Sequence, residues 1–211
     1  MKRSAVVIGV LVIAALLLVT GCGLRNTGTD DGAVLGDATG STARSAIMGA
    51  SLGGAAGGVI DQQMDQQAKE LRYELPGVTI DRVGEGIQVT FPDGLLFAFD
   101  SDDLSIVGRG YLKALASSLT KYPRTRSLIV GHTDSRPAGA YELGLSARRA
   151  ESAATFLAAQ GLNRDRMRTV GRGSTEPLAT NDSNAGRLQN RRVEVAIYAD
   201  DVMRRYAASR N

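Results

Sequence analysis

The stretch from Leu128 to Leu162 constrains the fold of this chain more than any other. It begins with a short apolar run, passes through Gly131-His132-Thr133-Asp134, and continues with apolar residues at helical spacing. Gly161 suits the position just past the end of a helix, where Leu162 can pack back against the last turn. A buried strand that leads into an amphipathic helix predicts a sheet with helices packed on it.

The flanking residues extend this pattern over one folded domain, residues 78–199. Apolar positions on either side of Gly84-Glu85-Gly86 predict an early hairpin. Residues 104–122 predict an amphipathic helix, and residues 127–131, 166–170 and 193–197 predict strands. Strands that alternate with helices predict an α/β sandwich with a mixed sheet, and about 120 residues are enough for one core.

Asp134 and Arg149 are the candidate functional residues of the strand–loop–helix stretch. Asp134 follows the carboxyl end of the predicted strand, where open α/β sheets bind ligands. Its carboxylate can accept from an ammonium, while Arg149 can bind a carboxylate at two points and Arg191 can add a second cation. This set suits a ligand with an amine and a carboxylate a few ångströms apart. The alternative is a structural Asp134–Arg149 ion pair, or a capping role for Asp134.

Several function classes lack the residues that they need. His132 is the only histidine, and no nucleophile elbow surrounds Ser135 or Ser146, so the sequence predicts no catalytic residues and no enzyme. One histidine and one cysteine predict no metal site, and we expect no cofactor. Without Lys2 and Arg3 the chain has 23 basic against 22 acidic residues, from 25 and 22 in the whole sequence, and aromatic residues make up 5%. We therefore expect no nucleic-acid partner.

The N-terminus has the features of a bacterial secretory signal. Lys2 and Arg3 precede an apolar run from Ala5 to Val19, which is short for a membrane span of roughly 20 residues. The run ends in Val-Thr-Gly-Cys, which resembles a lipobox, so residues 1–21 are predicted to be removed and Cys22 to be acylated, with palmitate among its acyl chains. Acyl chains give stable anchoring in a bilayer. Gly23, where an Asp would resemble an inner-membrane retention signal, favours the outer membrane.

Residues 22–77 link this anchor to the domain in three parts. Residues 22–45 are rich in Gly, Thr, Asp and Ser and are predicted to form a flexible tether. Residues 46–60 carry Gly49, Gly53 and Gly57 at every fourth position, which favours close helix packing in self-association or shallow membrane insertion. The alternative is a flexible linker, because glycine is a poor helix former in water. Residues 61–77 predict a polar helical linker, and residues 200–211 an exposed tail.

Three separated blocks of the domain, GHTDS, LSARRA and NAGRLQNRRVEV, resemble the OmpA C-terminal-like domain. The resemblance covers about Val89 to Ile197, and the glycine-rich segment is similar to that of some OmpA-family outer-membrane lipoproteins. It implies an α/β sandwich with a mixed four-stranded sheet, helices packed on one face, and an additional N-terminal hairpin strand. It also implies non-covalent binding of peptidoglycan through meso-diaminopimelate, with Asp134, Arg149, Arg191 and Asp102 at the ligand.

Two positions depart from the pattern of this family. Glu142 stands where the family usually has Asn ahead of the LSARRA block. After Thr133-Asp134-Ser135, where the family often has Gly one residue later, this chain has Arg136-Pro137. Glu142 brings a negative charge toward the predicted site. It can favour the ammonium of the ligand, or it can pair with Arg149 or Arg136 and compete with the ligand.

The sequence therefore predicts a lipid-anchored outer-membrane protein whose domain faces the periplasm and tethers the membrane to the cell wall. One alternative is a membrane-acting or oligomerising lipoprotein in which the glycine-rich segment is the functional part. Another is a component of a secretion or motor complex, although no ionisable residue lies in the apolar run from Ala5 to Val19.

Overall fold

The computed structural model describes residues 41–52, 57–98, 100–135 and 139–209. Residues 1–30 and 31–211 form two units, and all described residues belong to the second. The predicted signal peptide, Cys22, Gly53 and Pro137 lie outside the described residues. Within the described ranges, no helix combines the length and the apolar character that crossing a bilayer requires.

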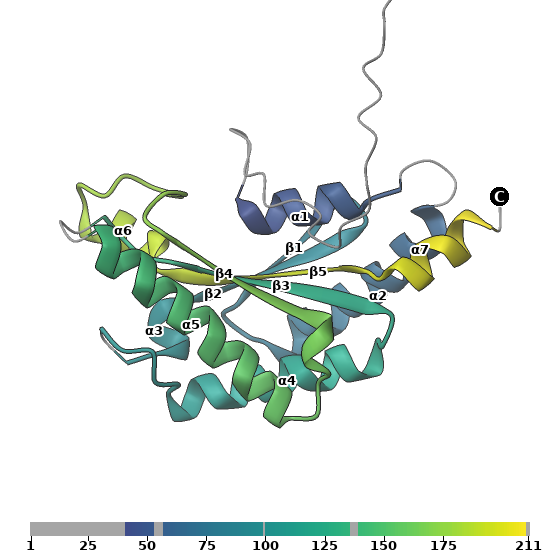
Figure 1. Cartoon of the computed structure of the whole chain (residues 1–211), viewed down its shortest axis with the longest axis horizontal. Coiled ribbons are helices and arrows are strands. Elements are labelled where there is room, and N and C mark those ends of the chain that lie inside the picture. The colour runs from purple at the N-terminus through teal and green to yellow at the C-terminus, as the bar shows by residue number, and fades with distance from the viewer. Residues whose placement is uncertain (1–40, 53–56, 99, 136–138, 210–211) are drawn as a thin grey trace, which may run out of the picture. The chain divides into compact units, whose positions relative to one another are not determined.

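A five-stranded sheet in the order β1-β2-β5-β3-β4 forms the centre of the domain (Figure 1). Its strands are β1 (Thr79–Val83), β2 (Gly86–Pro92), β3 (Thr125–His132), β4 (Met167–Gly173) and β5 (Arg192–Ala199). All neighbours pair antiparallel except β3 and β4, which are parallel. The predicted mixed sheet is confirmed, but the hairpin strand β1 is a full member of it, so the single sheet has five strands.

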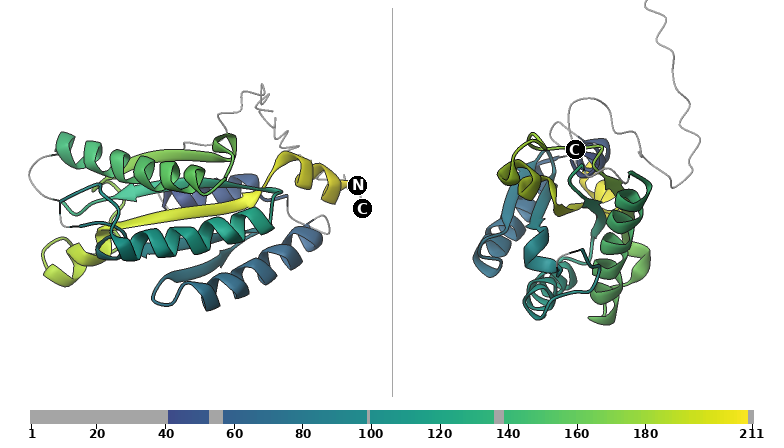
Figure 2. Two further views of the ribbon diagram at one scale, coloured as in Figure 1. Left: turned by 90° about the horizontal axis from the view of Figure 1, so that it is seen from below. Right: turned by 90° about the vertical axis from the view of Figure 1, so that its left-hand side faces the viewer.

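Helices cover the sheet, and three of them build the larger core on one face. These are α2 (Gly57–Glu74), α4 (Ile106–Lys121) and α5 (Gly139–Ala159), which lie side by side in Figure 2. Shorter elements connect the rest of the chain: α3 (Asp93–Leu96), the 3₁₀ turn η2 (Arg164–Arg166), α6 (Asn184–Asn190) and α7 (Asp201–Ala208).

A helix also covers the other face of the sheet, which the sequence did not predict. Helix α1 (Thr42–Ala50) packs Ala43, Ala46 and Ile47 against apolar side chains of β1, β3 and β5, namely Val83, Leu128, Val130 and Ala196. Figure 1 shows α1 on the side of the sheet opposite α4 and α5. Successive side chains of a strand point to opposite faces, so a strand that is apolar throughout requires cover on both.

Local sequence signals fix the ends of the elements that carry the site. The Ser105 side chain accepts from the Gly108 amide at 2.8 Å and so caps the start of α4. At the end of α5, Gly161 adopts φ +96° and the Leu162 amide donates to the Leu157 carbonyl at 3.2 Å. This is the Schellman arrangement that the sequence predicted, and it turns the chain back toward β4.

Candidate functional site

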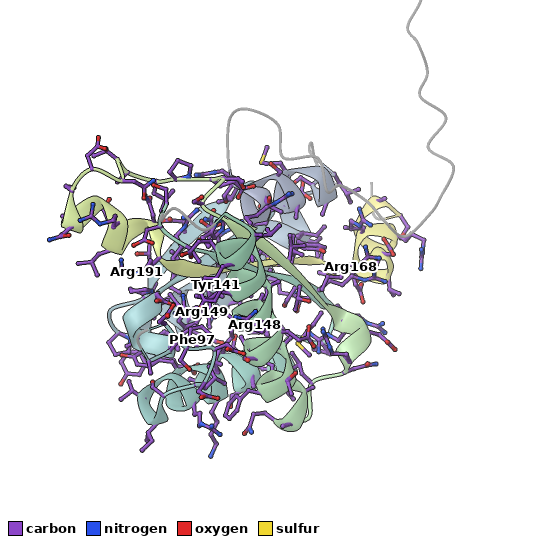
Figure 3. The ribbon with its side chains drawn as sticks, turned by 60° about the vertical axis from the view of Figure 1, so that its left-hand side comes forward. Phe97, Tyr141, Arg148, Arg149, Arg168 and Arg191 are labelled. Carbon is purple, nitrogen blue, oxygen red and sulfur yellow. The ribbon has the colours of Figure 1, made fainter. Side chains whose placement is uncertain are left out.

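A small pocket lies where β3 ends, beside the start of α3 and the N-terminal half of α5. Its lining comes from five parts of the chain and consists of Asp93, Asp100, Thr133, Asp134, Glu142, Leu145, Arg149 and Arg191. Three of the four residues assigned to the ligand from the sequence, Asp134, Arg149 and Arg191, therefore line one pocket. Figure 3 shows Arg149 and Arg191 on the side of the domain where Phe97 and Tyr141 also lie.

Asp134 pairs with Arg191, whereas the sequence suggested Arg149 as its partner. Asp134 is 2% exposed, and its Oδ2 lies 2.6 Å from Arg191 Nη1, a short, charge-assisted hydrogen bond. The Arg191 side chain is 21% exposed, so it lines the pocket and also reaches the solvent. The structural pair between Asp134 and Arg149 that was the alternative to a ligand site does not form.

Arg149 is held by three different groups. Its Nη1 lies 3.0 Å from Asp93 Oδ1, its Nε donates to the Ser101 carbonyl at 2.8 Å, and its guanidinium carbon lies 5.3 Å from the centre of the Phe97 ring. Asp93 Oδ1 accepts no well-aligned hydrogen bond among the described residues, so its contact with Arg149 is an ion pair of poor geometry. Arg149 can therefore redirect Nη1 toward another carboxylate without losing Ser101.

The sequence analysis missed Asp93, although a signal for it was present. Asp93 follows the end of β2, as Asp134 follows the end of β3, and its amide donates to the Arg191 carbonyl at 3.1 Å. Burial raises the pKa of the Asp93 carboxyl; the charges of Arg149 and Arg191 act against this, and the charge of Asp134 adds to it. The pocket thus holds an acid that is easier to protonate than an exposed aspartate.

Asp102, the fourth predicted ligand residue, does not line this pocket. It lies in a neighbouring groove between α4 and α5, and its Oδ1 is 3.6 Å from Arg148 Nε. Asp100 takes its place in the pocket, where Tyr141 donates a hydrogen bond to Asp100 Oδ1 at 3.2 Å. Asp100 has φ +52°, a conformation that Asp tolerates better than most residues.

The pocket has little free space and one unsatisfied hydroxyl. About 20 Å³ is accessible inside it, roughly the room of one water molecule. Thr133 is 3% exposed and lines the pocket, and its hydroxyl has no hydrogen-bond partner among the described residues. A ligand group larger than a water molecule can therefore enter only if lining side chains move, and it would meet the Thr133 hydroxyl there.

His132 lies on the opposite face of the sheet, in a buried polar cluster at the start of α1. Its Nδ1 is 3.9 Å from Glu176 Oε2 and its Nε2 is 3.7 Å from Glu194 Oε2. Glu176 also accepts from the Thr42 amide at 3.0 Å and so caps α1. The described residues contain no group of three or more potential metal ligands. The cluster therefore connects α1 to the sheet and lies outside the pocket.

Comparison with known proteins gives a family match for the domain and another for the glycine-rich region before it. The model of the OmpA family matches residues 96–191, and the model described as Glycine zipper matches residues 27–68. These matches cover the pocket, except Asp93, and the region from the predicted tether through α1 into α2. The glycine-rich stretch thus carries a family signature of its own.

Two curated proteins illustrate the likeness in sequence. Probable lipoprotein YiaD of Escherichia coli is 36% identical over 121 residues, which are 57% of this chain and 55% of that protein. The peptidoglycan-associated lipoprotein of Legionella pneumophila is 35% identical over 114 residues, 53% of this chain and 64% of that one. The chain thus matches 55% of the length of the first relative and 64% of the length of the second.

The likeness extends to solved structures. The cell wall anchor of the T6SS from Pseudomonas aeruginosa is 31% identical, with a TM-score of 0.54 over 67% of this chain and 97% of that one. It shares the fold of this domain. By its pocket-forming blocks, its fold and this coverage, the chain belongs to the OmpA family.

Proposed function

We propose that this protein binds peptidoglycan non-covalently, through the diaminopimelate of the stem peptide, in the pocket between β3 and α5. The observation that carries the proposal is the presence of Asp134, Arg149 and Arg191 around one pocket. The side-chain end of meso-diaminopimelate bears an ammonium and a carboxylate on one carbon. The pocket offers carboxylates for the first group and guanidiniums for the second.

Binding would proceed by exchange of ion-pair partners. Arg191 swings away from Asp134, and the ligand ammonium takes its place at the Asp134 carboxylate. The ligand carboxylate is then received by Arg191 and by Arg149, whose Nη1 is only loosely held by Asp93. The Thr133 hydroxyl is available as a further hydrogen-bonding group. The charges of Asp134, Arg149 and Arg191 each have a partner again in the complex, so the exchange leaves little of their desolvation uncompensated.

Relatives support this ligand class. The matched Legionella protein is named a peptidoglycan-associated lipoprotein, and the Pseudomonas structure is described as a cell wall anchor. With acylation at Cys22, the protein would hang from the outer membrane with its domain in the periplasm. It would then tether the membrane to the wall by binding, without catalysis.

Binding to sacculi tests the proposal. Asp134→Asn and Arg149→Gln should each weaken binding of the full chain to diaminopimelate-type sacculi, and to an isolated stem peptide, by roughly 30-fold or more. This corresponds to the 2–5 kcal/mol typical of truncating one partner of a buried charge pair. Arg164→Gln is the matched control, because Arg164 pairs with Glu151 on the surface, away from the pocket. Binding by both pocket variants at the level of this control would disprove the site.

Self-association through the glycine-rich segment is a second proposal, favoured by the Glycine zipper match. Gly49 is exposed on α1, and Met48 and Leu52 beside it are 56% and 41% exposed. These residues offer a small apolar surface on which Gly49 of a second copy would pack, whereas Gly57 begins a separate helix, α2. Gly49→Gln should then shift the full chain toward monomer in sedimentation velocity, while binding to sacculi persists.

A further inference from the structure

We propose that Glu142 makes this pocket select the amine of its ligand over the carboxylate, so that stem peptides with an amidated or missing side-chain carboxylate bind as well as diaminopimelate itself. This inference rests on the proposed function and defines its substrate class. The ligands in question are diaminopimelate with its side-chain carboxyl converted to an amide, and lysine, which has the ammonium alone.

Both arginines of the pocket already have carboxylate partners within the chain. Arg191 is bonded to Asp134 at 2.6 Å, and Arg149 lies 3.0 Å from Asp93. Neither guanidinium therefore needs the carboxylate of a ligand to be neutralised. If the ligand lacks that carboxylate, Arg149 keeps Asp93, and Arg191 can turn to the solvent that its side chain already reaches.

Glu142 is in the opposite situation. It is 6% exposed and lines the pocket, yet it forms no ion pair with any described residue. It pairs with neither Arg149 nor Arg191, so the competition with the ligand that its charge suggested is not seen among these partners. No cation of the described residues neutralises this carboxylate, and an ammonium that enters the pocket can supply one.

The charges of the whole pocket also favour an ammonium over a carboxylate. Four carboxyl groups, of Asp93, Asp100, Asp134 and Glu142, face two guanidiniums. The unsatisfied Thr133 hydroxyl adds a group that can accept from an ammonium or donate to an amide oxygen, and neither requires a carboxylate.

The first turn of α5 gives Glu142 a second possible role. A glutamate at this position is stabilised by the amide groups at the helix N-terminus, whether or not a ligand binds. The two roles differ in what they change: the helix interaction affects the stability of the fold, whereas selection of the amine affects the ratio of affinities for different ligands. A test must therefore measure that ratio.

The experiment is a calorimetric titration of the full chain in detergent with three stem peptides: diaminopimelate, amidated diaminopimelate and lysine. We expect the wild type to bind the amidated and lysine peptides at least as tightly as the diaminopimelate peptide. Glu142→Gln should weaken binding of the amidated and lysine peptides, which carry only the ammonium, by about tenfold, or about 1.4 kcal/mol. It should weaken binding of the zwitterionic diaminopimelate peptide by clearly less. Glu151→Gln, on the same helix but outside the pocket, removes one negative charge as a control and should leave the ratio unchanged.

The outcomes separate the inference from the function on which it rests. Selection of the amine would be wrong if Glu142→Gln weakened the binding of all three peptides equally. It would also be wrong if the wild type bound only the peptide with unamidated diaminopimelate. Either result would leave the peptidoglycan site standing. No binding of any peptide by the wild type would remove both. If Glu151→Gln changed the ratio of affinities as Glu142→Gln does, the ratio would depend on net charge alone, and the role of Glu142 would be wrong.

Discussion

Arg149 shows how single residues of this site combine structural and binding roles. It is 2% exposed, and it faces Asp93, which is 7% exposed and has a raised pKa because of burial. The Ser101 carbonyl and the Phe97 ring hold the guanidinium in place whether or not a carboxylate ligand is present. The residue that would bind the ligand is thus also the one that neutralises a buried acid.

Replacement of Arg149 should therefore destabilise the fold, and removal of Asp93 should correct this in part. Arg149→Met leaves a buried, unpaired carboxylate, so we expect a loss of about 3 kcal/mol in the free energy of unfolding. Arg149→Met with Asp93→Asn should recover at least about 1 kcal/mol, measured by urea denaturation as a double-mutant cycle. Arg164→Met, in a surface pair, should cost less than about 1 kcal/mol. A double variant no more stable than Arg149→Met would show that the pair is not coupled.

Glu194, in the cluster behind the pocket, links stability to pH. It is fully buried, and burial raises the pKa of its carboxyl, but the adjacent His132 and the Arg192 charge outweigh this and bring the pKa to about 2. Arg192 donates to Glu194 at 2.7 Å, and His132 Nε2 lies 3.7 Å from Glu194 Oε2. The folded-state pKa lies below the ordinary value of 4.5, so the ionised form stabilises the fold.

This stabilisation should be present above about pH 5 and disappear as the pH falls toward 2. A shift of this size corresponds to something on the order of 3 kcal/mol. The free energy of unfolding of the wild type should fall as the pH is lowered from 5 toward 2. Glu194→Gln should have a lower free energy of unfolding at pH 7, and this should fall less as the pH is lowered. Denaturant titrations at pH 7, 5 and 3 measure both slopes. Parallel slopes would mean that Glu194 does not carry the acid sensitivity.

At the scale of elements, α1 is the part that sequence reasoning did not foresee. Its buried apolar residues, Ala43, Ala46 and Ile47, are two alanines and a single large side chain. Their partners come from β1, β3 and β5, far along the chain, and local periodicity carries no information about such contacts. The indirect signal was the strand at residues 127–131, whose apolar residues point to both faces and so require cover on both.

Docking of α1 should depend on Ile47, which is 1% exposed and lies over Gly86 of β2. A Cβ at Gly86 would be 2.4 Å from Ile47 Cγ2, so the helix approaches the strand as closely as glycine allows. Ile47→Ala should cost about 2–5 kcal/mol and speed hydrogen exchange of α1. Met48→Ala, on the exposed side, should cost less than about 0.5 kcal/mol. Unchanged exchange in Ile47→Ala would mean that α1 is held by its polar cap at Glu176.

At the scale of the whole chain, the sequence predicted which residues form the site better than it predicted their partners. Asp134, Arg149 and Arg191 follow from strand ends and family blocks, and they meet in one pocket. Their pairing depends on distances of a few tenths of an ångström between segments up to 57 residues apart, which no spacing rule supplies. Asp93 obeys the same strand-end rule as Asp134, but its relevance appears only once β2 is known to lie beside β5.

The two attachments that we propose, acyl chains on Cys22 and the pocket around Asp134, predict bridging by the intact chain alone. Vesicles that carry the acylated protein should sediment with sacculi, because anchoring makes wall binding a surface event at high effective concentration. Cys22→Ser should lose palmitate label and vesicle association but still bind sacculi, and Asp134→Asn should stay on the vesicles without sedimenting. If Cys22→Ser still carried vesicles down with sacculi, another part of the chain would have to bind the bilayer, and the glycine-rich segment would be the first part to delete.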